Sequence, residues 1–182
     1  MEIVLIRHGK PASADNAVVG AAEYTKWIRR YNCSDVATDS RPDTKDVNKK
    51  SCYVVSSDFK RAIHSAHIYT GKSPELISEL FREMEIPRYK LPLTLKAMTW
   101  VYLCRVLWMF GLKGSFESYR LAKIRAELAA DKLIDLATIN SKVVLFGHGY
   151  LNVYIRKALM KKGWLLKSKS NAFWGVTNLK SK

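Results

Sequence analysis

Two histidines of this chain stand in the same setting, between an apolar run and a glycine. Residues 3–9 read Ile-Val-Leu-Ile-Arg-His-Gly, and residues 143–149 read Val-Val-Leu-Phe-Gly-His-Gly. Both apolar runs predict buried strands, and open α/β sheets bind their ligands at the carboxyl edge, where such strands end. A neutral imidazole can attack an electrophile or donate a hydrogen bond. His8 and His148 are therefore candidate catalytic residues.

Two arginines are expected beside these histidines. Arg7 directly precedes His8, and Arg61 follows a third strand-like run at residues 53–57. A guanidinium is a planar, permanently charged fork that suits phosphate. Three strand ends thus carry cationic or proton-carrying groups that could converge on one dianion.

With these residues in place, the chain resembles the histidine phosphatase superfamily, also called the phosphoglycerate mutase-like family. Leu80-Phe81-Arg82-Glu83 lies where such enzymes often carry an acidic proton donor, and Glu117-Ser118 resembles the start of the family's long helix. The order and spacing match over most of the chain. The strongest matching pieces are Leu5-Ile6-Arg7-His8-Gly9, Ser56-Ser57-Asp58 with Arg61-Ala62, and Phe146-Gly147-His148-Gly149.

The resemblance implies a phosphatase that hydrolyses phosphomonoesters through a phosphohistidine on His8. Arg7, Arg61 and His148 would complete the phosphate pocket, and the neighbouring arginines would disfavour protonation of His8. Because these cations neutralise the phosphate, neither a metal nor another cofactor is expected. Lys10 follows the glycine and would add charge at the mouth of the pocket.

Glu83 is the candidate general acid, and Glu85 is its rival. Residues two apart on an extended segment point the same way, so geometry does not choose between them. The match to Leu-x-x-Glu favours Glu83. Family members commonly follow this acid with a glycine-containing stretch, whereas Met84-Glu85-Ile86-Pro87 stands here.

The elements that must position these residues alternate along the chain. Hydrophobic periodicity predicts strands at 2–7, 53–57, 142–147 and 172–179, a short strand or extended edge at 76–82, and helices at 17–31, 58–70, 115–137 and 150–162. This alternation predicts an α/β protein, a three-layer α/β/α sandwich with a largely parallel central sheet. The resemblance implies its phosphoglycerate mutase-like form.

Finer features of these elements can also be predicted. Ser57 or Asp58 would cap the helix at 58–70. Leu121, Ile124 and Leu128, with the leucines that follow them, would form the apolar face of the helix at 115–137. The polar, irregular residues 33–51 predict a surface loop near the site.

Length and cysteine usage bound the class of protein. A chain of 182 residues fits one domain, residues 1–182, with a small cap segment around 84–114. The three cysteines are widely spaced and show no Cys-x-x-Cys pattern, which predicts reduced thiols in a cytoplasmic protein. The amino terminus does not read as a signal peptide, because Glu2 precedes the short apolar run and no basic region leads it.

The net charge of +15 comes from 31 basic and 16 acidic residues. Such a field attracts phosphorylated substrates, and it would also favour peripheral contact with an anionic membrane. The sequence contains no zinc finger or basic-zipper region, so nucleic acid is not an expected partner.

Residues 97–111 are almost wholly apolar but too short to span a bilayer, which needs about 20 apolar residues. They predict a cap helix packed on the core. The alternative is an interfacial helix in which aromatic and methionine side chains touch a membrane and lysines flank it. Those side chains are Trp100, Trp108, Met109 and Phe110, with Lys90, Lys96 and Lys113 around them.

A phosphatase is preferred over a phosphomutase. The family's mutases carry an elaborate cap between the acid and the second histidine, whereas the stretch from Glu83 to His148 holds one short apolar segment and one long helix. The alternatives are a phosphomutase of the same family and a non-catalytic basic module that binds an anion or a membrane. The expected substrate is a phosphorylated small molecule or a phosphoprotein.

Overall fold

The computed structural model describes residues 1–42 and 52–182, and its centre is a six-stranded sheet with the order β4-β3-β6-β1-β8-β7. Strands β4, β3, β6 and β1 run parallel, whereas β8 pairs antiparallel with β1 and β7 with β8. The prediction of a largely parallel sheet is confirmed. The strands are β1 (Glu2–Arg7), β3 (Tyr53–Ser56), β4 (Leu76–Ile77), β6 (Lys142–Gly147), β7 (Leu165–Ser168) and β8 (Val176–Lys180).

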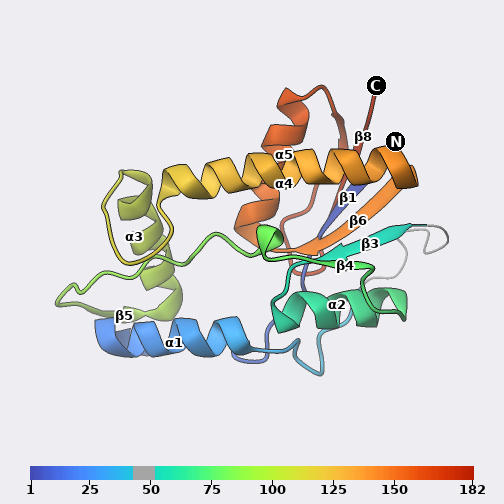
Figure 1. Cartoon of the computed structure of the whole chain (residues 1–182). Coiled ribbons are helices and arrows are strands. Elements are labelled where there is room, and N and C mark those ends of the chain that lie inside the picture. Colours follow the sequence, from blue (N-terminus) through green and yellow to red (C-terminus); the bar gives the residue numbers. More distant parts are fainter. Residues whose placement is uncertain (43–51) are drawn as a thin grey trace.

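Alternate side chains of the central strands pack on opposite faces of the sheet. Ile3 and Leu5 of β1 pack with helices α4 (Tyr119–Asn140) and α5 (Gly149–Lys161). Val4 and Ile6 pack on the other side with α2 (Lys60–Thr70). Figure 1 shows α4 and α5 on one side of the sheet and α2 on the other, as in the predicted three-layer sandwich.

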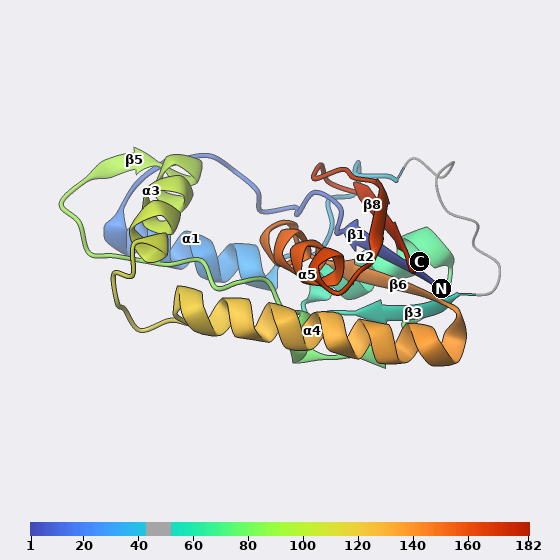
Figure 2. The same ribbon diagram turned by 90° about the horizontal axis from the view of Figure 1, so that it is seen from above.

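A separate helical unit lies at the end of the molecule opposite the two termini (Figure 2). It consists of α1 (Ala21–Cys33), α3 (Ala97–Met109) and a small two-stranded sheet of β2 (Val18–Gly20) and β5 (Thr94–Lys96). Its own hydrophobic cluster includes Tyr24 and Trp100, whose rings stack with centroids 5.3 Å apart. Helix α1 therefore contributes to this unit from outside residues 84–114.

Residues 97–109 form the predicted helix, but the membrane alternative is wrong about its tryptophans. Trp100 and Trp108 are at most 1% exposed, and their indole N–H groups donate to the carbonyl oxygens of Val19 and Glu117. The helix is fixed to the protein by these residues. No helix in the described part of the chain is long and apolar enough to cross a membrane.

The predicted cap of α2 is wrong. The helix begins after Phe59 and has no side-chain cap. Asp58 is instead held by a two-pronged ion pair with Arg82, whose Nε lies 2.8 Å from one carboxylate oxygen. The Ser57 hydroxyl accepts from the Phe59 N–H and contacts His148.

The predicted apolar face of α4 is right for Leu133 and Leu136, which are buried, and wrong for its first three members. Leu121, Ile124 and Leu128 are 57%, 42% and 56% exposed. The helix packs through a face rich in alanine, whose small side chains let it lie close to its neighbours. The buried residues are Ala122, Ala126, Ala129, Ala130, Leu133, Leu136 and Ala137.

Other differences are local. The extended edge expected at 76–82 divides into β4 and a 3₁₀ turn at Glu79–Phe81. The strand expected at 172–179 begins only at Val176. The loop expected at 33–51 is described as far as residue 42, and residues 43–51 lie outside the described residues.

Candidate active site

The predicted site residues meet at the carboxyl edge of the sheet. Arg7 is aligned with Gly147 across β1 and β6, and the backbone N–H of His8 donates to the Gly147 carbonyl at 3.0 Å. The rings of His8 and His148 lie edge to face with centroids 5.1 Å apart. The parallel pairing of β1 with β6 thus brings His8 together with His148, from a distant part of the sequence.

His8 is buried, and its geometry fixes where its lone pair lies. Its Nδ1 is 2.7 Å from the Gly9 carbonyl oxygen, which can only accept, so Nδ1 carries the proton of the neutral ring. The lone pair is then on Nε2, 3.2 Å from the Nε of Arg61. Burial, and then the positive charges of Arg61 and Arg7, hold the pKa of His8 well below its usual value. His8 is therefore a neutral imidazole near pH 7.

Arg61 is fully buried and anchored from the helical unit. Its Nη1 donates to the carbonyl oxygens of Tyr31 and Asn32 at the end of α1, at 3.0 and 3.2 Å. The guanidinium also lies over the rings of Tyr31 and Phe59, 4.8 and 4.7 Å from their centroids. Its Nη2 is buried and has no partner among the described residues.

Arg7 is held from the opposite side of the site. Its Nη1 donates to the Asn171 carbonyl at 2.8 Å, and its guanidinium lies 4.1 Å from the centroid of Phe173. Its Nε is buried without a partner in the described part of the chain. Gly149 permits this placement, because a Cβ at that position would lie 3.1 Å from Arg7 Nε.

His148 is fully buried, and burial followed by the charge of Arg61 keeps its pKa well below the usual value. Its Nε2 lies 2.7 Å from the Ser57 hydroxyl oxygen. We assign the hydroxyl proton to the bond with Nε2, the one acceptor that it contacts among the described residues, and this assignment puts the ring proton on Nδ1. That Nδ1 is buried and has no partner within the described residues.

Arg7 Nε, Arg61 Nη2 and His148 Nδ1 are thus donors whose hydrogen bonds are not satisfied within the described chain. An unsatisfied buried donor costs about 1–3 kcal/mol, and native structures keep few of them. Here they belong to two arginines and a histidine that meet the neutral His8 at the carboxyl edge of the sheet. This is the arrangement that an oxyanion such as a phosphate would complete.

The half-buried Glu83 lies at the start of α5. Its carboxylate accepts from the backbone N–H groups of Tyr150 and Leu151 at 3.0 and 2.8 Å, and from that of Met84. Because His148 offers no side-chain cap, Glu83 serves as the acceptor for the first turn of the helix that follows it.

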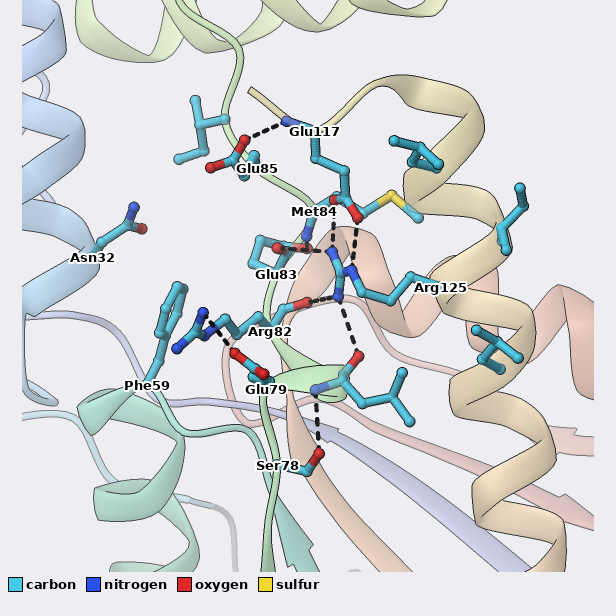
Figure 3. A pocket seen from close by; sticks show the side chains of 15 residues that line it. Asn32, Phe59, Ser78, Glu79, Arg82, Glu83, Met84, Glu85, Glu117 and Arg125 are labelled. Atoms are coloured by element: carbon cyan, nitrogen blue, oxygen red, sulfur yellow. Dashed lines mark hydrogen bonds and ion pairs between the residues drawn. The ribbon is translucent and has the colours of Figure 1, made fainter. Parts of the chain in front are cut away.

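Arg125 fixes the segment that carries Glu83 (Figure 3). Its Nη1 donates to the carbonyl oxygens of Arg82 and Leu80 at 2.7 and 3.2 Å. The same guanidinium forms a two-pronged ion pair with Glu117, with both contacts at 2.7 Å. Helix α4 thereby holds the backbone at residues 80–83 in place.

The structure separates Glu83 from Glu85. A cavity of about 450 Å³ is lined by Glu83 together with Arg7 and Gly149 from the site. Glu85 does not line it. Its exposed side chain accepts from the backbone N–H of Glu117. Glu83 and Glu85 both border a second, open groove, which Figure 3 shows.

Sequence comparison identifies no relative: no protein-family model and no curated protein matches the chain. Its structure is similar to a phosphoserine phosphatase from Entamoeba histolytica in complex with 3-phosphoglyceric acid, with a TM-score of 0.61 and 15% identity over 97% of this chain and 89% of the other. It is also similar to a putative alpha-ribazole-5'-P phosphatase from Escherichia coli, with a TM-score of 0.56 and 16% identity over 86% and 78% of the two chains. A mycobacterial glucosyl-3-phosphoglycerate phosphatase gives a TM-score of 0.51 and 16% identity over 88% and 82%.

The chain has the histidine phosphatase fold. This confirms, at the level of the fold, the resemblance predicted from the sequence. The three solved structures above are named as phosphatases, one of them as a putative phosphatase, and their identity to this chain is too low to transfer an activity.

The remaining predicted residue, Lys10, is exposed, and it does not line the cavity that Arg7 and Glu83 share. Its role at the pocket mouth stays a prediction. Within residues 1–42 and 52–182, no group of three or more His, Cys, Asp or Glu side chains is placed to hold a metal ion.

Several residues around the candidate site could not be predicted from the sequence. Ser57 lies in the Ser56-Ser57-Asp58 motif, but its contact with His148 joins two distant segments and could not be predicted from either one. Asn171 and Phe173 lie close to or inside a predicted strand, although the structure places both before β8. Arg105 interrupts the apolar run at 97–111, and nothing in that run predicts that it lines the cavity beside Glu83.

Proposed function

We propose that this protein is a metal-independent phosphatase that hydrolyses phosphomonoesters through a phosphohistidine on His8. The observation that carries the proposal is a buried, neutral His8 that meets Arg7, Arg61 and His148, each with a buried donor that has no partner among the described residues. The similarity to solved structures named as phosphatases supports phosphatase activity in general.

In the first step, Nε2 of His8 attacks phosphorus, and the bond between phosphorus and the ester oxygen breaks. Glu83, in its protonated form, gives a proton to the departing oxygen. In the second step, Glu83 as a carboxylate takes a proton from water, and the oxygen of that water displaces His8 from phosphorus. The products are an alcohol and inorganic phosphate, and His8 and Glu83 return to their starting states.

Arg7, Arg61 and His148 contribute by stabilising charge. Phosphoryl transfer requires little covalent work beyond a nucleophile, so positioning and electrostatic stabilisation supply most of the rate. The three unsatisfied donors would each reach an oxygen of the transferring group in a site that largely excludes water. Because these groups are fixed by Asn171, Tyr31 and Ser57 before substrate binds, little reorganisation is needed.

A phosphatase fits better than a phosphomutase, because the three phosphatases above share this fold over most of the chain. The substrate is a phosphorylated small molecule or a phosphoprotein, and neighbours of the same fold were solved with phosphoserine and 3-phosphoglyceric acid. The three free cysteines support a cytoplasmic location, which stays a prediction.

The proposal is tested by incubating the purified protein with nitrophenyl phosphate and a panel of phosphorylated metabolites. We expect phosphate release that the His8→Ala variant loses. His64→Ala is the matched control, because His64 lies on α2, is only part-buried and faces Asp35 instead of the site. No release from any substrate, or equal release by wild type and His8→Ala, would contradict the proposal.

A further inference from the structure

Arg105 is the one charged residue of α3, and it points inward. The residue is only 6% exposed, in a helix whose other members are apolar or neutral. A buried guanidinium loses its hydration and is costly unless every donor finds a partner. The partners of Arg105 therefore show whether it is a structural residue or a binding residue.

Part of the guanidinium is held by the protein. Nη2 donates to the Met84 carbonyl at 2.6 Å, and the group lies 4.9 and 4.5 Å from the ring centroids of Trp108 and Tyr150. Nη1, however, is buried and has no partner among the described residues. Arg105 thus shares the state of Arg7 and Arg61, each with one donor unsatisfied.

Glu83 does not satisfy Arg105. The two residues are close enough to interact electrostatically. The Glu83 oxygens nevertheless accept from the backbone N–H groups of residues 84, 150 and 151. Within residues 1–42 and 52–182, Arg105 forms no ion pair at bonding distance, with Glu83 or with any other carboxylate.

The cavity beside the site places Arg105 with respect to a substrate. Of its described lining residues, only Arg7, Glu83 and Arg105 are charged. The rest of the wall is mostly apolar, with Val101, Val106, Met109 and Val153 among its members. A ligand whose phosphoryl group met Arg7 would lie with its leaving group against an apolar wall that carries one further cation.

We propose that Arg105 binds a second anionic group of the substrate, so that the natural substrates are phosphomonoesters whose leaving group has an apolar part and ends in a carboxylate or a second phosphate. This inference rests on the proposed function, because it assigns the cavity to the leaving group. An anion would give the buried Nη1 of Arg105 the partner that it lacks among the described residues.

The test is a binding measurement with non-hydrolysable alkylphosphonates of increasing chain length. At each length, three compounds are compared, ending in methyl, carboxylate or a second phosphonate. At the best length, we expect an anion-ended compound to bind wild type about 10- to 100-fold more tightly than its methyl partner, the range for a hydrogen bond to a charged group. Which anion gains more identifies the group that Arg105 prefers.

Three variants assign the preference to Arg105. Arg105→Met, of similar length and apolar, should bind both members of a pair equally, and Arg105→Lys should keep part of the preference. Lys113→Met is the matched control, since it removes one positive charge at an exposed position just beyond α3, and its preference should equal that of wild type. If Arg105→Met does not fold, the comparison of wild type with Arg105→Lys still tests whether the preference for an anionic end depends on Arg105.

The outcomes separate the two proposals. Equal binding of all ends by wild type at every length would overturn the role of Arg105 and leave the phosphatase proposal intact. A preference that Arg105→Lys and Arg105→Met retain in full would also overturn it. If no phosphonate binds at all, both the anion site and the phosphate site are contradicted.

Discussion

His8 and His148 act as neutral rings, and the same burial that makes them neutral couples their protonation to folding. Both pKa values lie well below the usual 6.5, chiefly because of burial. In the unfolded chain the two rings regain ordinary values, so as the pH falls below about 6.5 the unfolded state takes up protons first. Stability is therefore fully present above that pH and is lost below it.

We expect the free energy of unfolding to fall as the pH is lowered from about 7 to about 5, by up to about 1.4 kcal/mol per pH unit for each buried histidine. His148→Gln should reduce this slope. Urea unfolding at several pH values measures it. His67→Gln, at an exposed position of α2, is the control and should leave the slope unchanged. An unaltered slope in His148→Gln would mean that His148 is not held neutral.

The role of Glu83 is tested by leaving groups that differ in their need for a proton. An alkoxide leaves poorly without one, whereas nitrophenolate leaves without help. Glu83→Gln should therefore slow alkyl phosphate hydrolysis by about 10²–10⁴-fold, the range of general acid catalysis, and slow nitrophenyl phosphate hydrolysis much less. Steady-state rates on the two substrates give the comparison.

Glu85→Gln is the matched control for Glu83. Because Glu85 is exposed and bonded to the backbone of Glu117, its loss should leave both substrates nearly unaffected. If Glu85→Gln shows the leaving-group dependence instead, Glu85 is the proton donor. Thermal unfolding of both variants separates a lost proton donor from a disturbed start of α5.

At the level of elements, helix α4 acts on the site through Arg125. We expect Arg125→Met to free residues 80–83 and to slow alkyl phosphate hydrolysis by about 10- to 100-fold, the cost of misplacing a catalytic group. Nitrophenyl phosphate should be much less affected, because the hydrogen bonds of Arg125 hold the segment that carries Glu83. Arg120→Met, exposed on the same helix, should match wild type. Equal losses on both substrates would show a general loss of structure.

The ends of the parallel strands could be predicted from sequence, and with them His8, Arg61 and His148. An apolar run that stops at a polar residue marks a strand end, and parallel strands end at one edge. Which face a helix buries could not be predicted for α4. The spacing of Leu121, Ile124 and Leu128 predicts that they lie on the apolar face. The helix instead packs closely against its neighbours through a face made mostly of alanines.

Contacts between distant segments could not be predicted from the sequence either. Two of the three backbone N–H groups that hold Glu83 belong to Tyr150 and Leu151 at the start of α5, 67 and 68 residues further along the chain, and the third belongs to its neighbour Met84. The buried position of Arg105 depends on the packing of α3 against residues 84–86. No periodicity within one segment carries such information.

For the molecule as a whole, two features favour contact with an anionic membrane. One is the net charge of +15, and the other is a pair of exposed aromatic side chains on and just after α3. Phe110 is 88% exposed and Tyr102 67%. We expect co-sedimentation with anionic vesicles that weakens at high salt, because salt screens the attraction, and that weakens further in Phe110→Ser.

Two comparisons control the vesicle experiment. Neutral vesicles should recover less protein than anionic ones. Leu165→Ser, exposed on β7, removes an apolar side chain from another region and should bind as wild type does. Equal recovery with neutral and anionic vesicles would leave the helical unit without a membrane role.

The proposed mechanism depends on a phosphohistidine at His8, and trapping this intermediate is its most direct test. The protein is mixed with a phosphomonoester labelled in its phosphoryl group and quenched within the first turnover. We expect label that is lost in acid, survives in base and maps to the peptide that contains His8, and no such label in His8→Ala. Label on another residue, or turnover by wild type without any phosphohistidine under conditions where its formation is faster than its hydrolysis, would contradict the account.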